Sequence, residues 1–231
     1  MTPADPLLSC VEVEPEGPAN AAVIWLHGLG ADGHDFEPIV PYLGLDPDVR
    51  ARFVFPHAPE RAVTINGGMI MRAWYDIRAV ALEREIDEGG VLESSEQIVA
   101  LIERERERGI APKRLVLAGF SQGGAIALHA ALRYPERLAG VLALSTYLVR
   151  EGTLDSERSQ VNQELPIFQA HGTLDPMVPL QNGERARDRL SELGYPLEWK
   201  TYPMGHEVHP GEIRDVGSVL NGWLNHQNLP V

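Results

Sequence analysis

Three residues spread along the chain have the side chains needed for nucleophilic acyl transfer: Ser121, Asp175 and His206. A serine hydroxyl is a weak nucleophile near neutral pH, so it needs a base that takes its proton. His206 would act as that base and would later protonate the leaving group. Asp175 would fix the imidazole tautomer and stabilise its cationic form. The ordered set, more than any single member, predicts catalysis through an acyl-serine intermediate.

The candidate nucleophile stands in the motif Gly119-Phe120-Ser121-Gln122-Gly123. An apolar run precedes the motif and an apolar helical pattern follows it, so Ser121 is predicted to occupy a tight strand-to-helix turn, the nucleophile elbow. A Cβ at either flanking glycine would crowd the neighbouring strand or helix. The N-terminus of the following helix would favour the negative charge that develops during acyl transfer.

Acyl transfer also needs hydrogen-bond donors for the oxyanion. One expected donor is the backbone N–H of Gln122, the residue after the nucleophile. The other is the backbone N–H of Leu29, in the glycine loop His27-Gly28-Leu29-Gly30 that follows an early strand. The glycines of this loop would let the backbone approach the substrate closely.

Short apolar runs, typical of buried parallel strands, alternate with helical patterns and must position these residues. The predicted strands cover residues 23–26, 53–55, 115–118, 140–144, 167–170 and 197–202, with an antiparallel edge strand near 9–14. One predicted helix is opened by a Ser94 cap, with Gln97 as its capping-box partner, and is stopped by Gly109 and Pro112. Further helices are expected at 125–132, 180–193 and 213–224, whereas residues 61–72 are expected to form a loop.

This alternation predicts an α/β fold: a mostly parallel, twisted sheet with helices on both faces, in a single domain over residues 1–231. Asp175 and His206 both follow predicted strands, and open α/β sheets place their sites at the carboxyl ends of strands. The segment 145–166 is too short for a large helical lid. We therefore expect a shallow, open pocket that admits bulky leaving groups.

Composition limits the partners. The net charge of −13 leaves no basic face for phosphates, so nucleic acid is a poor partner. One cysteine, Cys10, excludes an internal disulfide. Residues 1–13 lack the basic and apolar parts of a signal peptide, and no apolar run approaches the length of a membrane span. A cytoplasmic protein without integral membrane association is the expectation.

Two other patterns suggest different chemistry. Gly28-Leu29-Gly30-Ala31-Asp32-Gly33 matches the G-x-G-x-x-G of dinucleotide-binding folds, but no acid ends a strand about 20 residues later. His206 and His209 could belong to a metal site, although they are three residues apart and no third ligand is obvious. A nicotinamide oxidoreductase and a chance metal cluster therefore stay open as minor alternatives.

Four motifs in order resemble the acyl-protein thioesterase and bacterial carboxylesterase family of α/β-hydrolases. They are His27-Gly28-Leu29-Gly30-Ala31-Asp32-Gly33, Gly119-Phe120-Ser121-Gln122-Gly123-Gly124, His171-Gly172-Thr173-Leu174-Asp175-Pro176-Met177-Val178-Pro179 and Tyr202-Pro203-Met204-Gly205-His206. The resemblance runs from about Val23 to Leu224. It implies an α/β-hydrolase fold without a large lid, the triad and oxyanion donors named above, and neither metal nor organic cofactor.

The resemblance also bears on the substrate. Met71-Arg72-Ala73-Trp74-Tyr75-Asp76-Ile77 is similar to the bacterial esterase branch, which puts carboxylic esters of short to medium acyl chains first. Acyl-protein thioesterase or lysophospholipase activity on longer chains is the alternative, and a non-catalytic binder on a hydrolase fold is a remote one. We expect Leu29, Met69, Trp74 and Leu174 to border the acyl group. The sequence also allows a homodimer paired through exposed apolar loops.

Overall fold

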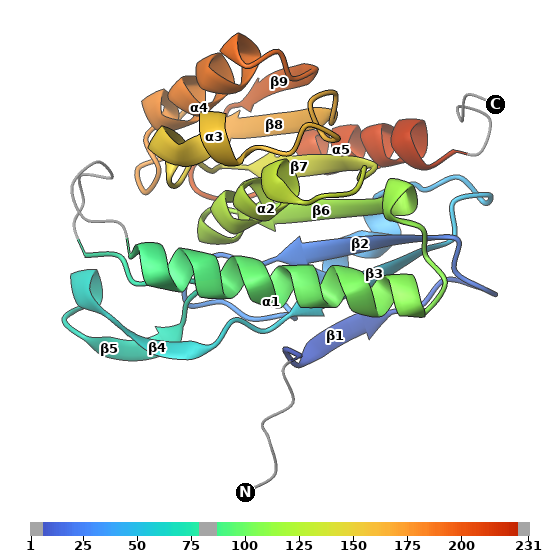
Figure 1. The fold of residues 1–231 in the computed structure, drawn as a ribbon, viewed down its shortest axis with the longest axis horizontal. Helices are drawn as coiled ribbons and strands as arrows, with labels where there is room; N and C mark the ends of the chain where they lie inside the picture. Colours follow the sequence, from blue (N-terminus) through green and yellow to red (C-terminus); the bar gives the residue numbers. More distant parts are fainter. Residues whose placement is uncertain (1–6, 79–86, 226–231) are drawn as a thin grey trace, which may run out of the picture.

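The computed structural model describes residues 7–78 and 87–225, and the first six residues of the predicted N-terminal segment lie outside this range. A seven-stranded sheet with the order β1-β3-β2-β6-β7-β8-β9 forms the middle layer (Figure 1). Its strands are β1 (Cys10–Val13), β2 (Ala21–Leu26), β3 (Ala51–Pro56), β6 (Leu115–Phe120), β7 (Gly140–Leu144), β8 (Ile167–Gly172) and β9 (Leu197–Tyr202). Only β1 runs antiparallel, paired with β3, which confirms the predicted edge strand and the mostly parallel sheet.

Helices cover both faces of this sheet. They are α1 (Glu88–Glu107), α2 (Gln122–Arg133), the one-turn α3 (Leu154–Glu157), α4 (Leu180–Glu192) and α5 (Pro210–Leu224), with a 3-10 helix, η1, at Glu37–Tyr42. Apolar residues of α1, α2 and α4 pack in one core cluster, whereas those of α5 pack in a second cluster with residues beside η1. Consecutive residues of β2 alternate between the clusters: Ile24 lies in the first, and Val23 and Trp25 lie in the second.

The central strands are apolar on both sides because both faces of the sheet are covered. Every residue of β2, β6, β7 and β8 is buried. No helix within the described ranges combines the length and the apolar character that a bilayer crossing requires. Between β7 and β8, only a 3-10 turn at Glu151–Thr153 and α3 interrupt the coil, so no large lid stands over the sheet in this segment.

The predicted start of the first long helix is wrong. Asp87 caps α1 by accepting a hydrogen bond from the Gly90 N–H, about two turns before the predicted cap. Ser94 lies inside the helix, is fully buried, and donates its hydroxyl to the Trp74 carbonyl. The end of the helix agrees with the prediction, since Gly109 adopts a φ of +94° directly after the C-cap.

The segment expected to be a loop is a β-hairpin. Strands β4 (Glu60–Val63) and β5 (Met69–Arg72) pair antiparallel and form a separate two-stranded sheet. Gly67 and Gly68, both at positive φ, make the reversal next to a short 3-10 turn at Thr64–Asn66. Figure 1 shows the hairpin at the lower left, beside the end of the molecule where α1 begins.

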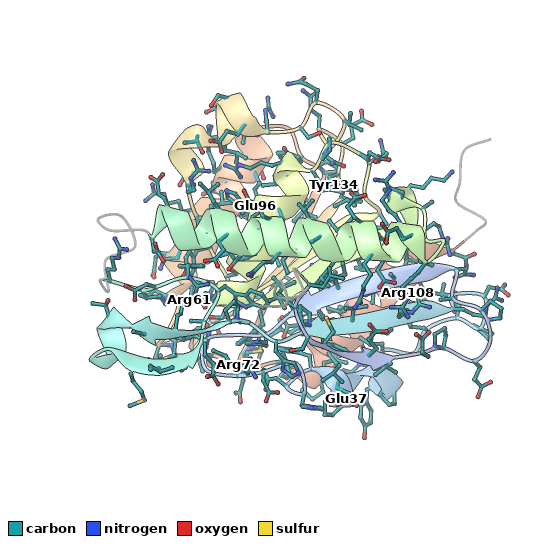
Figure 2. All side chains as sticks on the ribbon, turned by 60° about the horizontal axis from the view of Figure 1, so that its bottom comes forward. Glu37, Arg61, Arg72, Glu96, Arg108 and Tyr134 are labelled. Atoms are coloured by element: carbon teal, nitrogen blue, oxygen red, sulfur yellow. The ribbon has the colours of Figure 1, made fainter. Side chains whose placement is uncertain are left out.

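A network of ion pairs ties the far end of α1 to the edge of the sheet. Arg108, labelled in Figure 2, pairs with Glu12 and Glu14 of the N-terminal edge region. It also pairs with Glu105, a fully buried carboxylate that takes a second arginine, Arg52, from β3. The alternating charges of this helix therefore form a structural network that holds strand and helix together.

Candidate active site

Ser121 occupies the turn between β6 and α2 with a φ of 55° and a ψ of −123°. A non-glycine residue rarely adopts this strained conformation unless the surroundings enforce it. The two flanking glycines explain the enforcement. A Cβ at Gly119 would lie 2.4 Å from the Gly123 carbonyl oxygen, and a Cβ at Gly123 would lie 2.4 Å from the His27 carbonyl oxygen. Only glycine lets β6, α2 and β2 approach this closely.

The predicted acid and base are in direct contact. His206 Nδ1 lies 2.7 Å from Asp175 Oδ2. The other carboxylate oxygen accepts hydrogen bonds from the Met177 and Val178 N–H groups, at 2.8 and 2.9 Å. Because the carboxylate accepts from Nδ1–H, the neutral imidazole keeps its lone pair on Nε2, the form a general base requires.

The nucleophile elbow and the loop that carries His206 are neighbours at the carboxyl ends of the strands. The ring of Phe120, the residue before the nucleophile, lies 4.7 Å from the His206 ring, measured between centroids. Ser121 and Asp175 are nearly buried, and the His206 side chain is one-fifth exposed. Residues from the ends of β6, β8 and β9 therefore meet here, and contact between His206 and the Ser121 hydroxyl stays a prediction.

His27 is part of the framework of the glycine loop. Its Nε2 accepts the Ala58 N–H at 3.1 Å, so Nδ1 carries the hydrogen and donates to the Gly28 carbonyl at 2.7 Å. Burial lowers the pKa of His27 to about 4, which keeps the ring neutral at physiological pH. The neutral ring holds the backbone just before Leu29 in one conformation.

Neither predicted oxyanion donor lies within a strand: Leu29 is in the loop after β2, and Gln122 is at the start of α2. The N–H groups beside Leu29 are used, since Gly30 donates to the Arg72 carbonyl and Ala31 to the Gly28 carbonyl. Gln122 is the first residue of α2, where N–H groups have no partner inside the helix. A Cβ built on Gly28 would lie 3.6 Å from the Ser121 Cβ, so the loop and the elbow are adjacent.

The residues expected to border an acyl group differ in exposure. Met69 and Leu174 are 63% and 70% exposed, and Leu29 is partly buried. Leu174 is held near His206, because its N–H donates to the Met204 carbonyl. Trp74 is fully buried, and its indole N–H donates to the His27 carbonyl at 2.9 Å. The structure thus places Trp74 behind the glycine loop, in a position to support it; contact of these four residues with an acyl chain stays a prediction.

The alternative chemistries gain no support. The loop Gly28–Gly33 leads into the 3-10 helix η1, so the G-x-G-x-x-G pattern lacks the α-helix whose N-terminus would receive a pyrophosphate. His209 caps α5 by accepting the Gly211 N–H on Nδ1 at 3.0 Å. Within residues 7–78 and 87–225, no group of three histidine, cysteine or acidic side chains is arranged to hold a metal ion.

Several side chains hold the backbone of the site in place, and the sequence gives no sign of their contacts. The Gln122 side chain accepts the Trp74 N–H at 2.8 Å and donates to the Tyr75 carbonyl at 2.7 Å. The Thr146 hydroxyl donates to the Ser121 carbonyl at 2.6 Å. His171, fully buried, donates from Nε2 to the Val178 carbonyl at 2.9 Å and braces the Asp175 loop. Their partners are mostly far away in the chain, so no local pattern announces these contacts.

Comparisons with known proteins agree with this architecture. The family model for phospholipase/carboxylesterase matches residues 9–224. Acyl-protein thioesterase 1 of Neurospora crassa is 42% identical over 214 residues, covering 89% of this chain and 87% of that protein. Among solved structures, SOBER1 of Arabidopsis thaliana superposes with a TM-score of 0.84 at 34% identity, over 90% of this chain and 100% of that one.

A second solved structure, acyl-protein thioesterase 2 of Zea mays, gives a TM-score of 0.83 at 28% identity, over 94% of this chain and 99% of that one. The parallel sheet, the helices on both faces and the family match lead to one conclusion: the chain belongs to the phospholipase/carboxylesterase family of α/β-hydrolases.

Proposed function

We propose that this protein is a serine hydrolase that cleaves long-chain acyl thioesters, including those on cysteine side chains of acylated proteins. The hydrogen bond between His206 and Asp175, beside a serine on a strained elbow, is the observation that carries the catalytic part of the proposal. The motifs alone put short to medium carboxylic esters first. The similarity to acyl-protein thioesterases favours the thioesterase alternative instead.

The reaction follows from the assigned roles. His206 Nε2 takes the proton of the Ser121 hydroxyl as its oxygen attacks the acyl carbon, and Asp175 stabilises the imidazolium. The N–H groups of Leu29 and Gln122 would stabilise the oxyanion. The carbon–sulfur bond then breaks, and His206 gives its proton to the sulfur, so the leaving group departs as a thiol. His206 next takes a proton from water as the water oxygen attacks the acyl carbon; the bond between Ser121 Oγ and that carbon breaks, His206 returns the proton to Oγ, and the fatty acid is released.

A thioester suits this site for a chemical and a steric reason. A thiol has a pKa near 8.5, so a thiolate leaves more readily than an alkoxide. The segment between β7 and β8 carries only two short helical turns, which supports access of a leaving group as large as a protein. Exposed apolar side chains on β5 and on the Asp175 loop, Met69 and Leu174 among them, are suited to contact an acyl chain.

The direct test compares Ser121→Ala with the matched control Ser156→Ala, an exposed serine on α3. We expect Ser121→Ala to lose hydrolysis of thioesters and oxygen esters by at least about 10³-fold, and the control to match the wild type. A series of acyl thioesters and oxygen esters, paired at each chain length from short to long and compared by kcat/KM, tests the substrate class. Higher kcat/KM for short oxygen esters than for long thioesters would restore the carboxylesterase alternative.

A further inference from the structure

The side chain of Gln122 joins the two halves of the proposed oxyanion hole. These halves lie on different elements: Leu29 on the loop after β2, and the Gln122 N–H at the start of α2. Transition-state stabilisation requires both donors to be fixed relative to each other before the reaction. Gln122 is 1% exposed, and both polar atoms of its amide are hydrogen-bonded, so its side chain has one orientation.

The Gln122 amide belongs to a continuous hydrogen-bond network that crosses the site. Its oxygen accepts the Trp74 N–H at 2.8 Å, and its nitrogen donates to the Tyr75 carbonyl at 2.7 Å. The indole N–H of Trp74 donates in turn to the His27 carbonyl at 2.9 Å. His27 then fixes the Gly28 carbonyl through Nδ1 at 2.7 Å, one residue before Leu29.

Close packing between His27 and the start of α2 completes this hydrogen-bond network. The His27 carbonyl that receives the indole also faces Gly123, where a Cβ would come within 2.4 Å of it. The segment around Trp74 is anchored in turn, because Ser94 donates to the Trp74 carbonyl and the indole is fully buried. A polar network that is fully satisfied and buried holds a geometry more tightly than apolar packing does.

From this arrangement we propose that the Gln122 side chain is a positioning group that couples the two oxyanion donors through Trp74 and His27. The residue therefore has two tasks: its backbone N–H contacts the oxyanion, and its amide sets the distance to the second donor. The proposal rests on the proposed function, since it assumes acyl transfer at Ser121.

The test uses Gln122→Met, which keeps the side-chain volume and removes both hydrogen bonds. We expect kcat per active site, counted by fluorophosphonate titration, to fall about 10- to 100-fold, while KM changes less than about threefold. The inhibition constant of an acyl trifluoromethyl ketone, which mimics the tetrahedral intermediate, should rise by the same factor.

The matched control is Asn162→Leu. Asn162 is also a fully buried amide: it accepts the Leu138 N–H and donates to the Tyr134 and Glu136 carbonyls, away from the site. The control should lower the melting temperature and leave kcat per titrated site within twofold. A merely structural role for Gln122 predicts that both variants lose stability and that neither loses kcat.

A double-mutant cycle with Trp74→Phe completes the test, because this change removes the indole N–H. Two links of one network should be non-additive, so the double variant should lose about as much kcat as the more damaging single variant. Additive losses, or a Gln122→Met kcat within twofold of the wild type, would overturn the coupling. When such a result comes with an inactive Ser121→Ala variant, the coupling fails and the proposed function stands. When Ser121→Ala itself stays active in the same assays, the proposed function fails.

Discussion

Asp175 divides its two oxygens between its own loop and His206. Oδ1 accepts the Met177 and Val178 N–H groups, and Oδ2 lies 2.7 Å from His206 Nδ1. The first pair of hydrogen bonds fixes the carboxylate before it meets the imidazole, so the histidine is oriented by a group that cannot rotate. This rigidity allows a substitution that changes the proton arrangement and leaves the fold intact.

Asp175→Asn should lower kcat by about 10²- to 10⁴-fold with little change in stability. The amide oxygen can keep the Met177 and Val178 hydrogen bonds, which turns the amide NH₂ toward His206. Nδ1 must then accept, so the hydrogen moves to Nε2 and the base is lost. Asp188→Asn is the control, because the Asp188 side chain lies on the exposed side of α4. Steady-state kinetics and thermal unfolding of both variants provide the measurement; an active, stable Asp175→Asn enzyme would contradict the assigned role.

Gly123→Ala should destabilise the protein by about 1–3 kcal/mol and lower activity at least tenfold. The new Cβ would lie 2.4 Å from the His27 carbonyl oxygen and 2.6 Å from that of Leu26, both on backbone that cannot yield without moving β2. Gly152→Ala is the matched control, because a Cβ there meets nothing within 4 Å. Chemical denaturation should place the control within about 0.5 kcal/mol of the wild type.

The elements that sequence predicts well are those whose signal is local. The run before Gly119 is apolar on both faces, and the helix after Gly123 is nearly all apolar, so the elbow could be placed between them. Asp175 and His206 could be placed because parallel strands bring their carboxyl ends to one edge of the sheet. The hydrogen bond between these two residues confirms that they meet.

What sequence misses depends on distant partners. Ser94 looks like a helix cap, but Asp87 provides the cap, and the Ser94 hydroxyl donates to the carbonyl of Trp74, which lies 20 positions earlier in the chain. The β4–β5 hairpin carried one usable signal, the Gly67-Gly68 pair typical of tight turns, but its strands lack the buried face that would mark them as strands. The hydrogen bond between the Trp74 N–H and the Gln122 side chain joins residues 48 positions apart, so no local pattern in the sequence predicts it.

Met69→Ser and Leu174→Ser should reduce kcat/KM for long acyl chains about three- to tenfold each and leave short chains nearly unchanged. Both side chains are mostly exposed, so each change removes apolar surface available to a bound chain and little of the core. Val161→Ser, an exposed apolar residue elsewhere, serves as the control. The check is kcat/KM across a chain-length series. Equal losses at all lengths would show that these residues do not sense chain length.

Glu212→Gln should make the protein more stable at alkaline pH and flatten its pH dependence. Glu212 is 1% exposed in the first turn of α5, where burial, with a contribution from Asp215, raises its pKa from 4.5 to about 7. Below pH 4.5 both folded and unfolded states are protonated; as pH rises toward 7, the unfolded state ionises first, and the free energy of unfolding falls. Completed above pH 7, this loss amounts to about 3 kcal/mol.

Glutamine is the informative replacement because the capping box at the start of α5 needs a hydrogen-bond acceptor at position 212 and does not need a charge there. Oε2 of Glu212 accepts the His209 N–H at 3.2 Å, a bond that an amide oxygen can keep, while buried Oε1 has no partner among the described residues. Denaturation at pH 5, 6, 7 and 8 should show that the free energy of unfolding of Glu212→Gln rises relative to that of the wild type as pH rises. The control Glu60→Gln, at an exposed residue of β4, should follow the wild type. Parallel profiles for wild type and Glu212→Gln would mean that the buried carboxyl does not titrate in this range.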